Sequence, residues 1–425
     1  MDPIHTSITE YNDSIFVINV PRIKFGVNST KETGYEAKSL NIKNAMVFAG
    51  KKLSESRQME TLINSLNENN INYKIIDEIR VEPEDTAWLD TYKKIKDEKI
   101  DGFISLGGGS TIDTAKVMDL LYTYKGNLED YINKPIGKGI SPPGPLKPHI
   151  AIPTTAGTGS ETTNVAIFDV TKIKVKTGIS NPYLRPTIAI IDPVNTYSLP
   201  QSVTASSGLD VLNHAIESYT AIPYTGRQKV NPGDRPVYTG NTPIGDLFAK
   251  EAIKWVHTYM KRAYSDPYDS EARYYMMLGS SIAGMGFGHV GVHIPHAMGY
   301  PIAGMIKEWH PDDYDFGYPI VPHGIGTAIP AAYVFRYLSK YSDRFKDISS
   351  ILGIESGDTG DALFEYYIKL LKALKIPTNL SDIGFSDKNV EDLVNGTLKQ
   401  QRLISLSPKM LDKKELTEIF KECIG

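Results

Sequence analysis

The chain of 425 residues is longer than a single hydrophobic core normally supports, so we expect two domains. Its hydrophobic content of 41% and charged content of 23% are typical of a folded globular protein and exclude a disordered or fibrous one. The formal net charge of −4 provides no basic field, so we expect neither nucleic acid nor a membrane surface as a partner.

Cysteine usage and the lack of long apolar stretches bear on the compartment. Cys423 is the single cysteine, so the chain cannot form an intramolecular disulfide, which fits a reducing compartment. Residues 1–11 lack the apolar core of a signal peptide, and no run of about 18 apolar residues could span a membrane. These features predict a cytoplasmic protein.

Short apolar runs alternate with amphipathic stretches in the first half of the chain. The amphipathic stretches 53–66 and 85–95 predict helices, and the apolar runs predict strands at 45–49, 73–76, 102–106, 150–153 and 187–191. This alternation is typical of βα units that build a parallel sheet. We therefore expect an α/β domain over residues 1–197, with the Gly- and Pro-rich segment 137–148 at its surface.

Two glycine-containing loops follow predicted strands of this domain. The first, Gly107-Gly108-Gly109-Ser110, precedes a helical pattern over 112–122, and a helix N-terminus reached through glycines presents free N–H groups to a phosphate. The second, 153–163, offers many hydroxyl donors. A plain βα turn is the alternative for the first loop alone, because Gly-x-Gly-x-x-Gly is absent. Two such loops at the carboxyl ends of parallel strands favour a dinucleotide-binding domain.

After Asp192-Pro193 the strand pattern stops, and helical patterns separated by Gly, Pro and Asn clusters follow. We expect an all-α domain over residues 198–425, with helices at 208–219, 243–264, 271–284, 360–374 and 413–423. The segment 224–242 shows no periodic pattern and predicts a long ordered loop within this domain.

Carboxylate and imidazole side chains of the second domain predict a metal site. Asp210 and His214 stand four residues apart in a predicted helix and so share one face. A cluster of histidines follows: His289, His293, His296, His310 and His323. A surface polar pair is the alternative for Asp210 and His214, but their apolar neighbours argue against an exposed face. One carboxylate with several imidazoles favours iron(II) or zinc over calcium or magnesium.

These residues resemble the iron-containing alcohol dehydrogenase family. The matching motifs are the first glycine loop with Asp113 and Lys116, the loop 154–160, Asp210 with His214, His296-Ala297-Met298-Gly299-Tyr300-Pro301, and Pro322-His323-Gly324. The resemblance implies a dehydroquinate-synthase-like fold with a metal held in a cleft between the domains by Asp210, His214, His296 and His323. The cofactor-binding residues predicted from the resemblance and the two loops are Gly108, Gly109, Ser110, Asp113, Thr154, Thr155, Thr158, Ser160 and Lys176.

Two positions depart from the common pattern of the family. Many members have a histidine four residues after the third metal ligand as a candidate proton relay, whereas this chain has Tyr300, which we include among the candidate catalytic residues. Many members also have an aspartate at the position of Gly50, where it holds the adenine-ribose hydroxyls. Glycine followed by Lys51 and Lys52 leaves room and charge for a 2′-phosphate, so we expect Gly50 to favour NADP over NAD.

A narrower resemblance points to the hydroxyacid-oxoacid transhydrogenase branch, which passes a hydride between 4-hydroxybutyrate and 2-oxoglutarate. It rests on Tyr300, on the long spacer between His296 and His323, and on the segments 80–83, 135–139, 145–148 and 159–163. The leading hypothesis is an iron- or zinc-dependent NAD(P) oxidoreductase. It would transfer a hydride between a small alcohol or hydroxy acid and a carbonyl compound, as an alcohol dehydrogenase or as such a transhydrogenase.

Two alternatives stay open. An ordinary NADPH-dependent aldehyde reductase would share the metal and cofactor motifs. A catalytically inactive nucleotide-binding relative is disfavoured, because such a protein has no need to keep a carboxylate and three imidazoles together. We expect a small-molecule substrate and a homo-oligomer, and we expect His289, His293 and His310 to be structural or to support the metal ligands rather than to bind the metal themselves.

Overall fold

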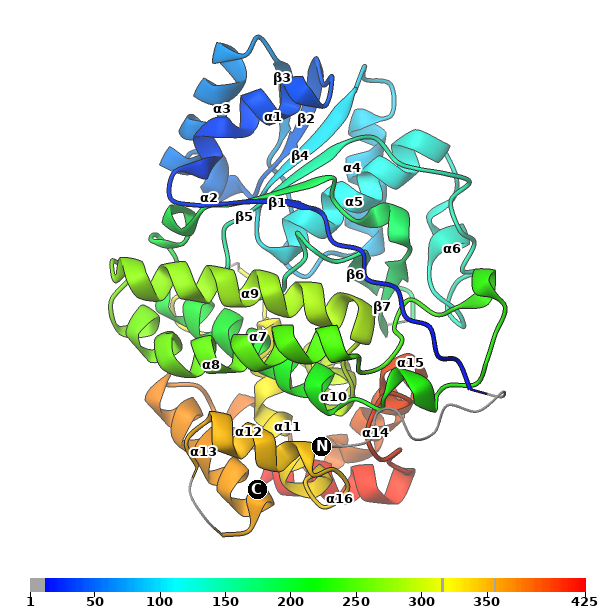
Figure 1. Ribbon diagram of the computed structural model, residues 1–425, viewed down its shortest axis with the longest axis vertical. Coiled ribbons are helices and arrows are strands. Elements are labelled where there is room, and N and C mark those ends of the chain that lie inside the picture. The colour runs from blue at the N-terminus through cyan, green and yellow to red at the C-terminus, as the bar shows by residue number, and fades with distance from the viewer. Residues whose placement is uncertain (1–11, 174, 315–316, 355–356) are drawn as a thin grey trace. The chain divides into compact units, whose positions relative to one another are not determined.

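The computed structural model describes residues 12–173, 175–314, 317–354 and 357–425 (Figure 1). The chain divides into two compact units, one of Asn19–Ser198 and one of Leu199–Gly425 together with residues 12–18. The division lies beside the predicted boundary at residue 197. The assignment of residues 12–18 differs from the prediction, which placed them with the α/β part.

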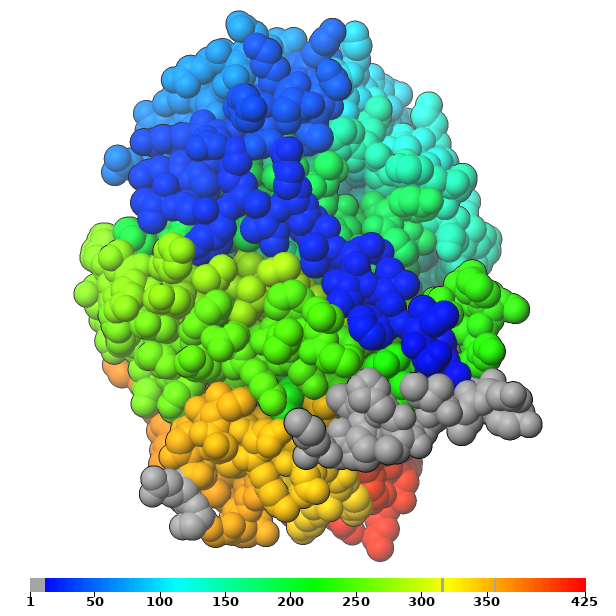
Figure 2. Space-filling model, viewed as in Figure 1, coloured from blue at the N-terminus to red at the C-terminus, as the bar shows by residue number. Residues whose placement is uncertain are grey.

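Side-chain contacts explain why residues 12–18 lie with the helical unit. The buried carboxylate of Asp13 pairs with Arg235 at 2.8 Å and with Arg227 at 3.4 Å. The ring of Phe16 meets the ring of Tyr224 edge-on, with 4.9 Å between the centroids. In the space-filling view, this N-terminal segment runs over the surface beside the green residues of the helical unit (Figure 2). These partners are more than 200 residues away in sequence, so no local sequence pattern could predict the contacts.

The unit Asn19–Ser198 is built on a six-stranded parallel sheet. Its strands, in spatial order, are β1 (Arg22–Phe25), β8 (Ile188–Ile191), β5 (His149–Pro153), β4 (Gly102–Gly107), β2 (Asn44–Phe48) and β3 (Asn72–Ile76). The central strands are mainly apolar, because both of their faces are buried, and the buried polar side chains of Ser105 and His149 contact each other at 2.8 Å. Five of the six strands coincide with predicted runs, whereas the sequence analysis missed the edge strand β1.

Helices cover both faces of the sheet (Figure 1). α1 (Thr33–Ser39) and α3 (Arg57–Glu68) pack on one face, and α4 (Asp85–Ile95) and α5 (Gly109–Tyr124) pack on the other. The short helices α2 (Lys51–Ser54) and α6 (Leu128–Tyr131) complete this set. An antiparallel hairpin of β6 (Val165–Val170) and β7 (Val175–Ser180), which the sequence analysis also missed, follows the second glycine loop.

The other unit contains helices and no β-sheet among its described residues. Its helices are α7 (Gln201–Thr220), α8 (Pro243–Ser265), α9 (Ser270–Val290), α10 (Ile294–Met305), α11 (His323–Leu338), α12 (Arg344–Ile351), α13 (Thr359–Ala373), α14 (Val390–Leu398), α15 (Gln401–Ile404) and α16 (Lys413–Ile424). The largely buried α7 packs against α8, α9 and α11. Among the described helices, none is both long and apolar enough to cross a membrane.

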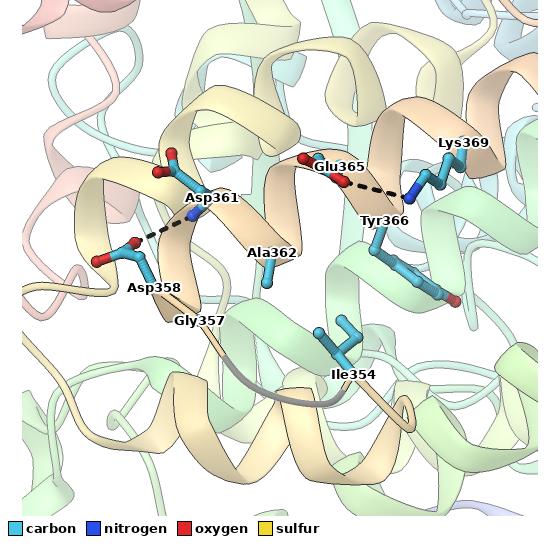
Figure 3. A pocket seen from close by; sticks show the side chains of 8 residues that line it. All are labelled: Ile354, Gly357, Asp358, Asp361, Ala362, Glu365, Tyr366 and Lys369. Atoms are coloured by element: carbon cyan, nitrogen blue, oxygen red, sulfur yellow. Dashed lines mark hydrogen bonds and ion pairs between the residues drawn. The ribbon is translucent and has the colours of Figure 1, made fainter.

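A surface hollow of about 440 Å³ lies along α13 (Figure 3). Its lining combines the acidic residues Asp358, Asp361 and Glu365 with Lys369 and with uncharged residues. None of the predicted site residues lines this hollow, so it does not serve as the candidate active site.

Candidate metal and cofactor sites

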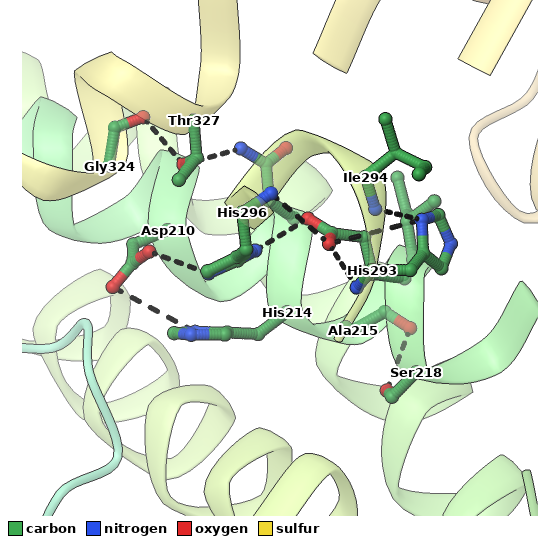
Figure 4. A network of polar contacts seen from close by, with 12 residues as sticks. Asp210, His214, Ala215, Ser218, His293, Ile294, His296, Gly324 and Thr327 are labelled. Carbon is green, nitrogen blue, oxygen red and sulfur yellow. Dashed lines mark hydrogen bonds and ion pairs between the residues drawn. The ribbon is translucent and has the colours of Figure 1, made fainter. Parts of the chain in front are cut away.

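Three of the four predicted metal ligands converge inside the helical unit (Figure 4). Asp210 and His214 lie one turn apart on α7, and His296 comes from α10. One potential ligand atom from each lies within 4.8 Å of the others. Asp210 Oδ1 is 3.6 Å from His296 Nε2, and Asp210 Oδ2 is 3.8 Å from His214 Nδ1.

The polar atoms of this group are buried without hydrogen-bond partners. Both Asp210 oxygens, His214 Nδ1 and His296 Nε2 are in this state. Burying a carboxylate and two imidazole nitrogens without partners is costly, and a divalent cation would satisfy all of them. One carboxylate with imidazoles is a donor set suited to iron(II) or zinc, so the residues present fit the metal that the sequence predicts.

The fourth predicted ligand, His323, is the first residue of α11. Its ring centroid is 5.3 Å from that of His296 and 6.0 Å from that of Tyr300, which lies one turn beyond His296 on α10. His323 is half-buried and is not in the group of three with close ligand atoms. The structure therefore brings the predicted ligands and Tyr300 into one neighbourhood.

Glu217 orients His296 and is not among the site residues predicted from the sequence. Its fully buried carboxylate accepts a hydrogen bond from His296 Nδ1 at 2.6 Å and one from the backbone N–H of His293 at 2.7 Å. A proton held on Nδ1 leaves Nε2, which faces Asp210, as the nitrogen that can bind a metal. Glu217 follows Asp210 by seven residues on α7, so helical spacing alone could have identified it.

Burial and these contacts set the protonation of the two imidazoles. Burial lowers the pKa of His214 to about 3, so its ring is neutral and can act as a ligand. Burial also opposes protonation of His296, but the carboxylates of Glu217 and Asp210 outweigh it and raise the pKa to about 9. Without a metal, His296 therefore carries a proton that a metal would have to displace.

Packing fixes the ring of His214 and the helix that carries it. The ring of Phe287, from α9, stacks on His214 with 3.9 Å between centroids and 8° between planes. Asn213, beside His214, accepts from Tyr367 Oη at 2.8 Å and donates to Thr327 Oγ1 at 3.0 Å. Because Thr327 lies one turn after His323, this network ties α7 to the start of α11.

Two of the remaining histidines make hydrogen-bonding contacts within the helical unit. His293 Nδ1 accepts from the N–H of Ile294 at 2.8 Å, and its Nε2 contacts Thr220 Oγ1 at 2.9 Å. His289 Nε2 contacts Thr242 Oγ1 at 3.0 Å, and that hydroxyl caps the N-terminus of α8. The third, His310, contacts the carbonyl of its neighbour Pro311 through Nδ1 at 3.0 Å.

The two glycine loops of the other unit lie against each other. The N–H of Thr154 donates to the carbonyl of Gly107 at 3.0 Å, where the adjacent strands β4 and β5 end. A Cβ on Gly109 would come within 2.7 Å of the Thr158 side chain, and one on Gly108 within 3.3 Å of Thr155. Glycine is thus required at position 109 for the loops to approach, and the N-terminus of α5 opens beside Thr155 and Thr158.

Other predicted cofactor residues are engaged within the protein. Asp113 and Ser160 are buried and both bond to Lys116 of α5. Lys176, on β7, pairs with Glu82 at 2.6 Å and with Asp169 at 2.8 Å, and these neighbours hold its pKa above the ordinary value although burial opposes the charge.

Ser110, the first residue after the glycines, contacts the same acidic residue. Its Oγ accepts from the backbone N–H of Glu82 at 3.2 Å. Glu82 has a φ of 53°, a left-handed conformation that directs its N–H at Ser110 while its carboxylate reaches Lys176. Glu82 thereby connects the first glycine loop to the β6–β7 hairpin.

Gly50 lies just beyond β2, the strand next to β4. No atom lies within 4 Å of a Cβ placed on it, so the space beside it is open. The neighbouring Lys51 pairs with Asp77, at the end of β3, at 3.0 Å. Lys51 is mostly exposed, so this cation borders the open space but already has an anionic partner.

Comparison with known proteins identifies the family. The family model described as iron-containing alcohol dehydrogenase matches residues 21–193, and the model of the C-terminal part of Fe-containing alcohol dehydrogenases matches residues 237–424. The chain is 42% identical over 418 residues to a protein of Bos taurus named hydroxyacid-oxoacid transhydrogenase, mitochondrial, covering 96% of this chain and 90% of the relative. It is 41% identical to a Xenopus tropicalis protein of the same name, covering 99% and 92%.

A solved structure shows the same architecture. A crystal structure of 1,3-propanediol oxidoreductase matches with a TM-score of 0.84 at 27% identity, covering 96% of this chain and 100% of that one. The predicted fold, an α/β part with a helical C-terminal part, is confirmed, as is the resemblance to the transhydrogenase branch. The protein is an oxidoreductase that depends on iron and NAD(P). The chain belongs to the iron-containing alcohol dehydrogenase family.

Proposed function

We propose that this enzyme transfers a hydride from a hydroxy acid to an oxo acid through a nicotinamide that stays bound between the two half-reactions. The observation that carries the proposal is the 42% identity, over nearly the whole chain, to relatives named hydroxyacid-oxoacid transhydrogenase. An NADPH-dependent aldehyde reductase is the alternative, because it would use the same metal and cofactor residues.

We propose that Asp210, His214, His296 and His323 hold the iron, with zinc as an alternative metal. When bound, the ion acts as a Lewis acid on the substrate oxygen, and the nicotinamide accepts or donates the hydride. The residues of the chain then have separate tasks. Glu217 keeps the proton on His296 Nδ1, and Tyr300, beside His323, is the candidate for moving the proton of the substrate hydroxyl.

The metal assignment is tested by His214→Ala and His323→Ala. Both variants should lose bound metal and turnover, whereas His257→Ala should keep both. His257 is a suitable control because it is a partly buried histidine of the same unit that contacts Tyr366 and none of the proposed ligands. Full activity of a metal-free preparation would contradict the assignment.

We propose that the two glycine loops bind the dinucleotide, through Gly108, Gly109 and Ser110 in the first and Thr154, Thr155 and Thr158 in the second. The support is the meeting of both loops at the carboxyl ends of β4 and β5, with the N-terminus of α5 beside them. NADP is the proposed preference, because Gly50 leaves room where an aspartate would repel a 2′-phosphate. A clear preference of the wild-type protein for NAD would show that preference to be wrong.

Transhydrogenation is tested without free cofactor. Purified protein is mixed with 4-hydroxybutyrate and 2-oxoglutarate, and the expected product is 2-hydroxyglutarate, formed as 4-hydroxybutyrate is oxidised to its aldehyde. Both substrates are carboxylates, and Arg402, whose guanidinium lies 4.9 Å from the ring centroid of Tyr238, is a candidate cation. No product, together with rapid NADPH-dependent reduction of simple aldehydes, would favour the aldehyde reductase.

Three broader predictions are also proposals. The dinucleotide-binding role of residues 1–197 and the metal-binding role of 198–425 can be tested by the variants above. A cytoplasmic location is tested by cell fractionation, since the relatives carry the word mitochondrial in their names. A homo-oligomer without affinity for nucleic acid is tested by light scattering and by a nucleic-acid binding assay.

A further inference from the structure

A fully buried lysine lies at the centre of the dinucleotide-binding unit. Lys116 is on α5, and its side chain has 0% exposure. Its ammonium group donates to Asp113 Oδ1 at 3.2 Å, Ser160 Oγ at 2.8 Å, Thr163 Oγ1 at 3.2 Å and the carbonyl of Val165 at 2.7 Å. We call Lys116, Asp113, Ser160 and Thr163 the Lys116 cluster.

The charge of Lys116 is compensated inside this cluster. Asp113 Oδ1 also accepts from Ser160 Oγ, and Asp113 Oδ2 accepts from the N–H of Ile167 at 2.9 Å. Burial lowers the pKa of Lys116, and the Asp113 carboxylate opposes that shift. A core position on a helix needs only an apolar side chain, so a buried ion pair with four acceptors calls for a reason other than core packing.

The partners of Lys116 show what it holds. Ser160, Thr163 and Val165 belong to one stretch of chain, which begins within the second glycine loop and ends at the start of β6. Residues 154–164 contain neither helix nor strand, so no regular ladder of backbone bonds sets their course. The contacts to Lys116 and Asp113 therefore anchor this stretch to α5.

The position of that stretch sets the contact between the two glycine loops. Thr158, two residues before Ser160, packs so closely on Gly109 that a Cβ there would lie 2.7 Å away. Within the second loop, the N–H of Ser160 donates to Thr158 Oγ1 at 3.2 Å and so ties these two residues together. A shift of Ser160 would thus move Thr158 relative to the N-terminus of α5, where the phosphate groups would bind.

We infer that Lys116 is a positioning residue for the dinucleotide: it holds the second loop at the distance from the first that the cofactor requires. Asp113 and Ser160 then act on the cofactor through this cluster. The inference rests on the proposed binding of NAD(P) by the two loops and adds a residue that sets their spacing.

The test compares Lys116→Met with Val117→Ala in the full-length protein. Val117 is the next residue on α5 and is fully buried in the hydrophobic core, so its truncation loosens the same helix without touching the Lys116 cluster. Bound nucleotide is first removed and identified, and binding of NADPH and NADH to the stripped protein is then measured by fluorescence titration, alongside melting temperature, metal content, KM and kcat. We expect Lys116→Met to raise the Kd for both cofactors about tenfold, and KM with it, while kcat at saturation changes less and metal content stays unchanged.

Two further variants keep the inference falsifiable if Lys116→Met folds poorly. Asp113→Asn with Lys116→Met removes both charges, so it should recover melting temperature and leave the Kd raised. Thr163→Val removes one acceptor and should raise the Kd about threefold. An unchanged Kd in the double variant, or an equal rise in Val117→Ala, would overturn the inference. If the wild-type protein binds neither NADPH nor NADH, the proposed cofactor loops fail instead.

Discussion

Replacing Glu217 by glutamine should weaken metal binding without removing any proposed ligand. The carboxylate accepts from His296 Nδ1 at 2.6 Å, so it increases the basicity of Nε2 and holds the ring toward Asp210. Loss of such a partner typically costs 10- to 100-fold in metal affinity, or about 1.4 to 2.7 kcal/mol. Glutamine preserves the size of the side chain, so this loss reports charge rather than packing.

The loss should depend on pH, because Glu217 also stabilises the protonated form of His296. In the metal-free protein the pKa of His296 is about 9, so below that pH a metal must displace a proton. The metal affinity of the wild-type protein then falls about tenfold for each pH unit below 9. Near pH 7 it is roughly 100-fold lower than above pH 9. In the variant this pKa falls and proton competition weakens. The difference between the two proteins should be largest near pH 9 and much smaller near pH 7.

The assay is competition between the metal-free protein and a chelator for zinc or cobalt at both pH values. Glu36→Gln is the matched control, because Glu36 is also buried and ion-paired, with Arg22 and Lys24, and belongs to the other unit. It should leave metal affinity unchanged. Equal affinities of wild type and Glu217→Gln near pH 9, or the same loss at both pH values, would refute the role assigned to Glu217.

Four further predictions concern the cofactor, the packing, the proton path and stability. Gly50→Asp should shift the ratio of NADH to NADPH affinity toward NADH, and Asp77→Asn should shift it the other way by freeing Lys51 of its partner, as fluorescence titration would show. Phe287→Leu, which removes the ring stacked on His214, should lower metal affinity more than it lowers the melting temperature. Tyr300→Phe should lower kcat while metal content, measured by atomic absorption, stays constant. Burial raises the pKa of Asp119 from 3.8 to about 7 in the folded protein. The contribution of Asp119 to stability is therefore full below about pH 4 and is lost as the pH rises through 7. In Asp119→Asn, the melting temperature should not show this decrease between pH 4 and 7.

Much of the fold follows from local patterns in the sequence. The predicted helix 85–95 has the bounds of α4, and five predicted strands coincide with β2, β3, β4, β5 and β8 to within about two residues. Of these strands, β2, β4, β5 and β8 are buried on both faces, so their runs are mainly apolar and easily recognised, whereas the edge strand β3 is largely exposed.

Some of the elements that were missed have sequences that do not match the usual local pattern of a helix or a strand. α10 contains Pro301 and α11 contains Pro330 in their interiors, yet both helices are largely buried and tertiary packing outweighs the lost backbone bonds. The hairpin of β6 and β7 contains the charged pair Asp169 and Lys176, and charged residues in such a segment predict a solvent-exposed loop rather than buried strands.

The residues of the candidate metal site also differ in how well local sequence patterns predict them. The metal-ligand types, Asp210 with His214 and the later histidines, could be predicted because ligand chemistry and helical spacing are local properties. The residues that orient these ligands were not predicted. One of them could have been predicted from the sequence, and another could not. Glu217 shares a helix face with Asp210 and was within reach of the same spacing argument, whereas Phe287 comes from another helix and no pattern in the chain links it to His214.

Lys116 shows why buried charges are the hardest class to assign. In sequence it stands three residues after Asp113 on a helix, the spacing of an ordinary surface ion pair. In the structure both are buried, and their partners come from a segment more than forty residues later. Desolvation makes such a pair unfavourable unless every donor and acceptor is matched, so its existence depends on a loop whose course the pair itself helps to set. That mutual dependence is a property of the folded protein, and it makes the spacing of the two glycine loops sensitive to a residue that neither loop contains.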